Sequence, residues 1–172
     1  LGSAGVLLEA KEKGRTVRLG FSGDIGRYDV PILRDPEPLA NLDALIMEST
    51  YGNRTHEKIE DVDKELADII KSVVKAGGKI IIPAFAVGRT QMLVYRLHRM
   101  LEEGMIPRIP VFVDSPMACS ATDVFRKHPD FFDKEAYDHF MNDKEDPFFG
   151  QGFACIREVE ASKKLNRLTE PH

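Results

Sequence analysis

The stretch Phe21-Ser22-Gly23-Asp24-Ile25-Gly26-Arg27 closes an apolar run and places a carboxylate in a glycine-containing loop. The later stretch Met47-Glu48-Ser49-Thr50-Tyr51-Gly52-Asn53-Arg54 repeats this arrangement, with Glu48 after a second apolar run. A carboxylate at a strand end suits an oxygen-ligated divalent metal or an acid–base role. Taken alone, Asp24 also fits a turn carboxylate that accepts backbone N–H groups. The two stretches together, in this order, favour the catalytic interpretation.

The N-terminal third predicts a hairpin, a loop and a short strand. Residues 3–10 and 15–22 form an antiparallel hairpin in this prediction, because apolar side chains alternate along both segments and a polar turn joins them. Prolines within 29–41 predict an irregular loop. The short apolar run at 44–47 is typical of a buried strand.

The rest of the chain alternates helices with strands. Apolar residues recur every three or four positions over 58–76, which indicates an amphipathic helix that Gly77-Gly78 ends. The further predicted elements are strand 79–82, helix 88–103, strand 111–113, helices 116–127 and 133–142, strand 153–156 and helix 159–167. This alternation predicts an α/β fold with a doubly wound, mainly parallel sheet, preceded by the hairpin. No Gly-x-Gly-x-x-Gly or P-loop is present, so no nucleotide-cofactor site is expected.

The charge balance argues against a large basic surface. The 172 residues include 24 Lys and Arg against 28 Asp and Glu, a formal net charge of −4. Nucleic-acid-binding domains usually present a basic face, so this composition leaves room for a narrow groove lined by a few cations. A hydrophobic content of 42% is enough for a packed core.

Cys119 and Cys155 are isolated in the sequence, with no Cys-x-x-Cys. This pattern predicts reduced, buried thiols and a cytoplasmic location. No stretch approaches the roughly 20 apolar residues of a membrane span, so no membrane association is expected. The chain does not begin with Met, so its first residues carry no information about targeting.

Several motifs, spread along nearly the whole chain, resemble one family. They are Leu1-Gly2-Ser3-Ala4-Gly5, the two stretches quoted above, Ile82-Pro83-Ala84-Phe85-Ala86-Val87-Gly88-Arg89, Asp114-Ser115-Pro116-Met117-Ala118, and Glu160-Ala161-Ser162-Lys163-Lys164-Leu165-Asn166. In content and order they are similar to the β-CASP branch of the metallo-β-lactamase superfamily. The members of that branch cut RNA or, in some cases, DNA.

The resemblance implies that this chain is an excised middle piece of a zinc enzyme. In the family, two zinc ions are held by several histidines and by an Asp in the Ser-Gly-Asp stretch, and of these ligands the sequence matches Asp24 alone. The resemblance assigns residues 1–42 to the edge of the catalytic domain and residues 43–172 to a β-CASP domain that is incomplete at its C-terminus. It also implies that the piece alone is inactive and holds no zinc.

The resemblance gives the two carboxylates different roles. Asp24 matches the family aspartate that bridges both zinc ions, where it would hold two Lewis acids close to the scissile phosphate. Glu48 matches the acid of the first β-CASP motif, and it would orient a histidine or handle a proton. The alternative for Glu48 is a carboxylate that caps a turn after the strand.

Four further residues are candidate substrate contacts. Tyr51 would stack on or hydrogen-bond to a nucleotide, and Arg89 would pair with a phosphate. Their alternatives are a half-buried core edge and a helix-start salt bridge. Ser115 also follows a predicted strand, where open α/β sheets place ligands. His56 lies in the loop after Tyr51, whereas most or all of the five histidines are expected at the surface.

These observations predict part of a zinc-dependent phosphodiesterase that cleaves RNA, with the β-CASP domain clamping substrate over the metal site. One alternative is a non-catalytic module that clamps nucleic acid. Another is a metal-dependent hydrolase of a different substrate, which the β-CASP resemblance disfavours. RNA is the expected partner, single-stranded DNA and a homodimer are left open, and no membrane is expected.

Overall fold

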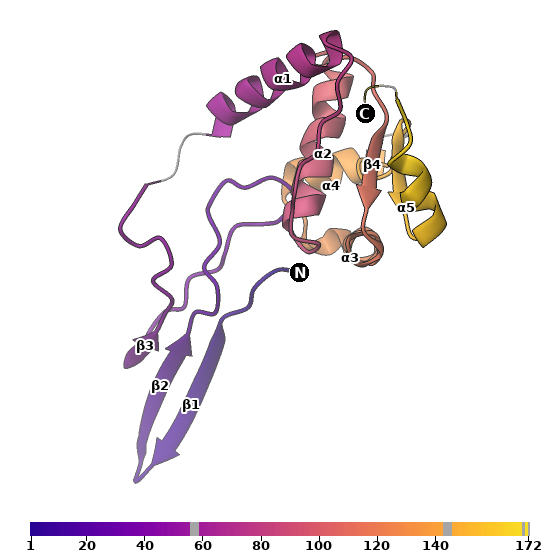
Figure 1. Ribbon diagram of the computed structural model, residues 1–172. Coiled ribbons are helices and arrows are strands. Elements are labelled where there is room, and N and C mark those ends of the chain that lie inside the picture. The colour runs from indigo at the N-terminus through magenta and orange to yellow at the C-terminus, as the bar shows by residue number, and fades with distance from the viewer. Residues whose placement is uncertain (56–58, 143–145, 170, 172) are drawn as a thin grey trace.

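The computed structural model describes residues 1–55, 59–142, 146–169 and 171. Figure 1 shows a long extension formed by the first three strands and, beyond it, a compact body that contains the helices. Within the described ranges, none of the helices combines the length and apolar content that a membrane span requires.

The extension begins with an antiparallel hairpin. Strands β1 (Val6–Glu12) and β2 (Arg15–Phe21) pair from Val6 opposite Phe21 to Glu12 opposite Arg15. Lys13 and Gly14 form the turn with φ of 48° and 80°. Two positive φ angles match the twist of a two-residue hairpin loop.

A third strand completes this sheet. Strand β3 (Ala44–Ile46) runs parallel to β2, with Leu19 opposite Ala44. The sequence places this segment in the second predicted domain, whereas here it pairs with the hairpin. The division at residue 42 stays a prediction.

The body holds the remaining elements. They are α1 (Ile59–Lys75), α2 (Arg89–Glu102), β4 (Val111–Asp114), α3 (Pro116–Lys127), the 3₁₀ turn η1 (Pro129–Phe131), α4 (Lys134–Asn142), β5 (Phe153–Ile156) and α5 (Val159–Leu165). Strand β4 pairs with β5 in parallel, from Val111 opposite Phe153 to Asp114 opposite Ile156. The predicted stop of α1 is confirmed, because Gly77 has a φ of 72° and the Gly78 N–H donates to Val73 O at 2.9 Å.

Two apolar clusters form the core of the body. The larger cluster gathers buried side chains of α2, α3, α4 and β4 around Phe132 and Phe148. The ring centroids of these two residues lie 6.0 Å apart in an edge-to-face arrangement. In the smaller cluster, Ala67 and Ile70 of α1 pack with Leu97 and Met100 of α2.

The proline-containing loop 29–41 joins the extension to the body. Ile32 is 2% exposed and belongs to the larger cluster. The Asp133 N–H donates to Ile32 O at 2.8 Å, and the Arg34 N–H donates to Phe131 O at 3.1 Å. The loop is irregular apart from one bridge between Leu33 and Phe132. Burial of Ile32 holds this β-branched residue at a φ of 86°, a conformation rare outside glycine.

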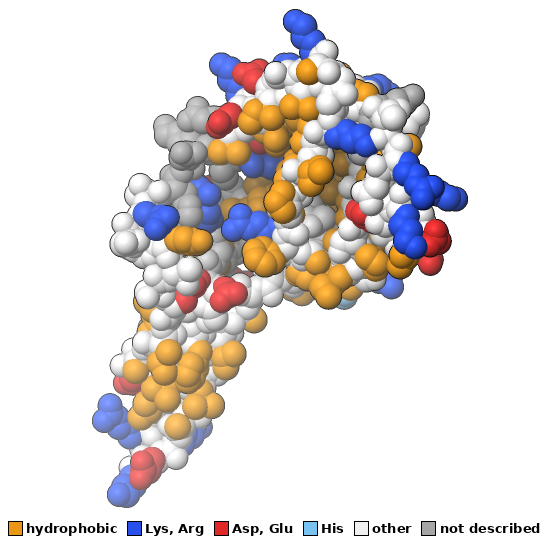
Figure 2. All heavy atoms as spheres, in the orientation of Figure 1, with side chains coloured by type: hydrophobic (Ala, Val, Ile, Leu, Met, Phe, Trp, Pro, Cys, Tyr) orange, Lys and Arg blue, Asp and Glu red, His pale blue; other side chains and the backbone are white. Residues whose placement is uncertain are grey.

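The α/β class is confirmed, but the described residues form two small sheets rather than one doubly wound sheet. The predicted strand 79–82 is absent, and Ile81 is 89% exposed. Figure 2 shows hydrophobic side chains over this segment and over the extension. An apolar run indicates burial without specifying a partner strand, so the sequence alone could not place this segment.

The two cysteines are not isolated thiols. Cys119 of α3 and Cys155 of β5 form a disulfide, with their Cα atoms 5.8 Å apart. The prediction of reduced cysteines is therefore wrong. Burial is confirmed for Cys119, which is 0% exposed, whereas Cys155 is only partly buried. Sequence spacing missed the pair because 36 residues separate the two positions. The cytoplasmic location stays a prediction.

A buried amide ties the start of α2 to α3. Gln91 is 0% exposed. Its Oε1 accepts the Gly88 N–H at 2.7 Å, and its Nε2 donates to Ala86 O, Ala118 O and the Thr122 hydroxyl at 3.1, 3.2 and 2.9 Å. One side chain therefore fixes the loop before α2, the first turn of α2 and the middle of α3.

We expect Gln91→Leu to destabilise the chain, because it leaves buried polar groups without a partner. Each such group costs about 1–3 kcal/mol. Urea unfolding of Gln91→Leu, Thr122→Val and the double variant measures the loss and the coupling between the two side chains. Thr122→Val alone should cost less, since Gln91 keeps its other partners. A Gln91→Leu chain as stable as the parent, or strictly additive losses, would contradict this assignment.

Candidate functional site

Parallel pairing of β2 and β3 brings the two carboxylate loops together. The Ser22 N–H donates to Ile46 O at 3.0 Å, which extends the ladder past the end of β2. The Glu48 N–H then donates to Ser22 Oγ at 3.2 Å. Both loops therefore leave the sheet side by side at the carboxyl ends of the strands, where open α/β sheets carry ligands.

Gly23 sets the course of the loop that carries Asp24. It has a φ of 59°, and a Cβ added there would lie 2.8 Å from the carbonyl oxygen of Ala4. Any other side chain would force the loop away from the first residues of the chain. Asp24 follows directly and is exposed.

Glu48 holds the Asp24 loop from the other side. Its Oε1 accepts the N–H of Ile25, the residue after Asp24. This backbone hydrogen bond, followed by a hydrogen bond from the Thr50 side chain, lowers the pKa of Glu48 below 4.5, and burial opposes the shift. A negatively charged acceptor strengthens such a hydrogen bond. Ionised Glu48 therefore holds the Asp24 loop in place next to Asp24, the candidate catalytic residue.

Tyr51 adopts a backbone conformation that is rare for a bulky residue. Its φ is 56°, and the residue is 55% exposed. The Gly52 N–H donates to Ser49 O at 3.0 Å, and the Arg54 N–H donates to Tyr51 O at 3.1 Å. The Arg54 guanidinium carbon lies 5.1 Å from the ring centroid, within cation–π range. Two tight turns thus present an aromatic ring and a cation together after Glu48.

Arg89 and Ser115 lie in the body, at the starts of α2 and α3. Arg89 is exposed and lines a surface cavity of about 560 Å³ with Phe85, Met92 and Arg96. Ser115 is the N-cap of α3, and its Oγ accepts the Ala118 N–H at 3.2 Å. Gln91 connects these two helix starts, whereas Asp24 and Glu48 belong to the loops at the ends of β2 and β3. His56, the remaining candidate, lies outside the described residues.

The expectation that most or all histidines are at the surface fails for His98, which is 3% exposed. The signal was in the helical spacing. Val94 and Tyr95 lie three and four residues after Gln91, and His98 lies four and three residues after them, so all four share one buried face of α2. Gln91 and His98 are polar, so a periodicity of apolar residues alone does not include them.

Comparison with known proteins identifies relatives along the chain. Residues 90–172 match the family model described as the Beta-Casp domain. "Ribonuclease TTHA0252" of Thermus thermophilus is 37% identical over 172 residues, which is 99% of this chain and 38% of that protein. "Transcription termination factor FttA" of Methanosarcina mazei is 30% identical over 155 residues, 88% of this chain and 24% of that protein.

A third relative also matches most of the chain. "Endoribonuclease YSH1" of Candida glabrata is 32% identical over 149 residues, 84% of this chain and 19% of that protein. The chain therefore spans less than two fifths of the length of these three relatives.

The pKa of Glu48 gives a direct test of its contact with the Asp24 loop. Because folding lowers this pKa from 4.5, the bond stabilises the loop fully above that pH. This contribution is lost as the pH falls through the lowered folded value. We expect NMR titration to show the Ile25 amide shift following the Glu48 carboxyl carbon, with a midpoint below 4.5.

Glu48→Gln is the control for that titration, because it keeps an acceptor for the Ile25 N–H but has no ionisable group. The Ile25 amide should then lose its pH response in this range. An unchanged response in Glu48→Gln, or a parental midpoint at or above 4.5, would show that the bond does not form in solution.

Proposed function

Because this chain belongs to the β-CASP family of the metallo-β-lactamase superfamily, we propose that it forms part of a phosphodiesterase that cleaves RNA. Relatives that match most of the chain are named as a ribonuclease and an endoribonuclease, which supports RNA as the substrate class. Membership in this family implies dependence on a metal ion. We propose that this metal is zinc, with two ions in each active site.

The observation that carries this proposal is the bond from the Ile25 N–H to Glu48. It joins the two loops whose motifs carry the family resemblance and leaves Asp24 exposed beside the contact. An exposed carboxylate held on a fixed loop can bind a metal or orient a nucleophile. Asp24 is therefore the catalytic candidate, and Glu48 acts as a positioning residue that holds its loop.

The described residues do not by themselves fit a zinc ion at Asp24. Among them, no set of three His, Cys, Asp or Glu ligand atoms includes Asp24, whereas zinc normally takes four ligands. Glu48 already accepts a backbone N–H. Asp24 would be one contributor to a larger ligand set.

The substrate contacts of the proposal lie in both parts of the chain. Tyr51 offers an exposed ring for base stacking, with Arg54 against it. Arg89 offers a guanidinium for phosphate at the cavity it shares with Phe85, whose side chain is 80% exposed. Ser115 would contribute its hydroxyl hydrogen, since its oxygen already caps α3.

A second candidate function is a clamping module without chemistry of its own. The cavity beside Arg89 favours it, because an exposed aromatic ring and an arginine together suit a single-stranded nucleic acid. In this case the chain alone would bind RNA, or single-stranded DNA, and cleave neither.

Asp24→Ala and Glu48→Ala should fail differently in the longer, active protein that we propose. Loss of a metal ligand should lower bound metal and activity together. Loss of Glu48 should free the Asp24 loop and slow cleavage by up to about 10²–10⁴-fold, the range typical of general acid–base assistance. Metal analysis beside single-turnover cleavage of labelled RNA, at saturating zinc, separates the two effects.

Glu48→Gln distinguishes positioning from proton transfer. Glutamine can still accept the Ile25 N–H, so a positioning role predicts that most of the rate returns in Glu48→Gln. A rate as low as in Glu48→Ala would assign Glu48 to proton handling instead. A parental rate in both variants would leave Glu48 as a turn-capping carboxylate.

The chain alone should bind RNA weakly, because a net charge of −4 allows few phosphates to be neutralised. We expect dissociation constants in the non-specific range of about 10⁻⁴–10⁻⁶ M at physiological salt. Arg89→Ala should reduce the salt dependence by about one phosphate contact. Arg15→Ala, the same charge change at the hairpin turn, is the matched control.

Fluorescence anisotropy with a single-stranded RNA measures both effects. A nanomolar constant at physiological salt would favour the clamping module over the nuclease part. Equal losses in Arg89→Ala and Arg15→Ala would remove Arg89 from the proposed RNA contact.

A further inference from the structure

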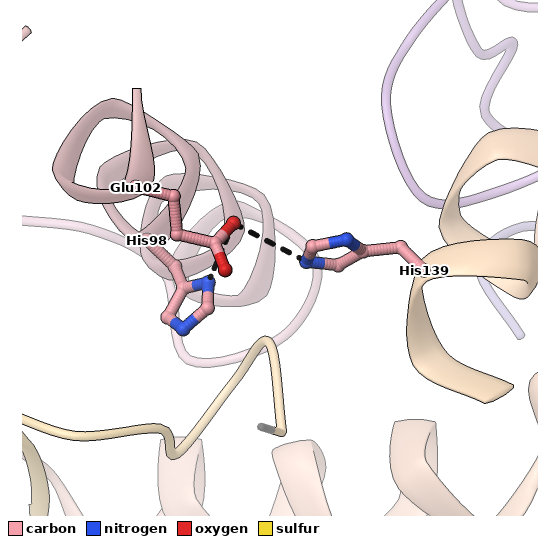
Figure 3. Close-up of side chains that lie close together, drawn as sticks. All are labelled: His98, Glu102 and His139. Atoms are coloured by element: carbon pink, nitrogen blue, oxygen red, sulfur yellow. Dashed lines mark ion pairs between the residues drawn. The ribbon is translucent and has the colours of Figure 1, made fainter. Parts of the chain in front are cut away.

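Three side chains with metal-binding atoms meet between α2 and α4. His98 and Glu102 lie four residues apart on α2, and His139 lies on α4. Figure 3 shows the two imidazole rings facing the Glu102 carboxylate from different sides. His98 Nδ1 and His139 Nε2 each lie 3.6 Å from the same oxygen, Glu102 Oε2.

The spacing of these atoms fits a metal ion better than direct hydrogen bonds. A separation of 3.6 Å is longer than an N–H···O hydrogen bond. A tetrahedral ion with bonds of about 2.0–2.2 Å holds neighbouring ligand atoms roughly 3.3–3.6 Å apart. The three ligand atoms lie within 4.8 Å of one another, so small side-chain shifts bring them around one ion.

Packing holds both rings in place. His98 is 3% exposed, and its ring centroid lies 5.6 Å from that of Phe153. The His139 ring meets Tyr95 edge-on, with centroids 5.9 Å apart. Gly150 approaches so closely that a Cβ there would lie 2.6 Å from His98 Nε2. Rings fixed by packing lose little freedom when they bind a metal.

The cluster is open to solvent on the Glu102 side, where this side chain is 44% exposed. A cavity of about 370 Å³ is lined by His98, Glu102 and Arg108 but not by His139, and on the α2 side of the cluster it would admit an ion and a fourth ligand. The positive charge of Arg108 favours an anion in that fourth position. Arg99, on the same helix, pairs with Glu103 and Glu135.

We propose that His98, Glu102 and His139 bind one divalent transition-metal ion of the zinc type, which joins α2 to α4. Two imidazoles and a carboxylate suit zinc and its first-row neighbours, whereas magnesium and calcium prefer oxygen ligands. An ion that binds the folded chain alone stabilises it. The site uses none of the residues of the proposed nuclease function and does not depend on it.

Zinc titration of the chain, freed of metal with a chelator, tests this site. We expect calorimetry to detect one ion that is lost in Glu102→Gln and His139→Gln, and zinc to raise the unfolding temperature of the parent. Cobalt should give the visible bands of a tetrahedral site. Each variant should weaken binding by at least about tenfold, because loss of even an outer partner of a metal ligand costs about 10–100-fold.

Two controls separate this site from other zinc binding. His128→Gln removes an exposed histidine at the end of α3, and it should bind zinc as the parent does. Asp24→Ala removes the candidate catalytic carboxylate and shows whether the zinc that calorimetry detects is held there instead. Circular dichroism and unfolding in chelator establish that Glu102→Gln and His139→Gln are folded without metal.

The proposal is overturned if zinc leaves the unfolding temperature of the parent unchanged. It is equally overturned if Glu102→Gln and His139→Gln bind zinc as tightly as the parent. Loss of binding in Asp24→Ala alone would place the ion at Asp24 and also contradict the proposal. In these cases the cluster is a carboxylate between two histidines that holds the helices without a metal.

Discussion

The candidate site depends on the parallel pairing of β2 with β3. Because the two strands run in the same direction, the loops that follow them leave the sheet at one edge. Ser22 and Glu48 then bond across the loops, and the Glu48 carboxylate accepts the Ile25 N–H. Two acidic residues that are 24 positions apart in the sequence thus share one short hydrogen-bonded segment. An antiparallel pairing would have sent the loops to opposite ends.

The body contributes through buried polar groups as much as through apolar packing. The side-chain amide of Gln91 forms hydrogen bonds to the loop before α2 and to α3. The positions of Arg89 and Ser115 therefore depend on each other. Ile32 packs into the same core and so anchors the extension to the body. Its backbone adopts a positive φ, which is unfavourable for a β-branched residue. Ile32 thus joins the extension to the body, whereas Gln91 joins two segments within the body.

Sequence patterns predicted an element well where its apolar periodicity and its end signal lay within that one segment. The 3.6-residue period located α1 and α2, and the Gly77-Gly78 stop matched the end of α1 within two residues. Prediction failed where the outcome depended on a distant partner. The run 79–82 has strand composition but no pairing among the described residues, and Cys119 meets Cys155 through the fold rather than through spacing.

The sequence by itself determined the family, the α/β class, most element positions and the two acidic loops, since motifs and periodicity are local properties of the chain. Tertiary structure alone decided that β3 joins the hairpin, that Glu48 holds the Asp24 loop, and that His98, Glu102 and His139 converge. Each of these depends on residues from separate elements. Strand pairing and helix packing bring these residues together. A local sequence pattern does not show which distant residues will meet.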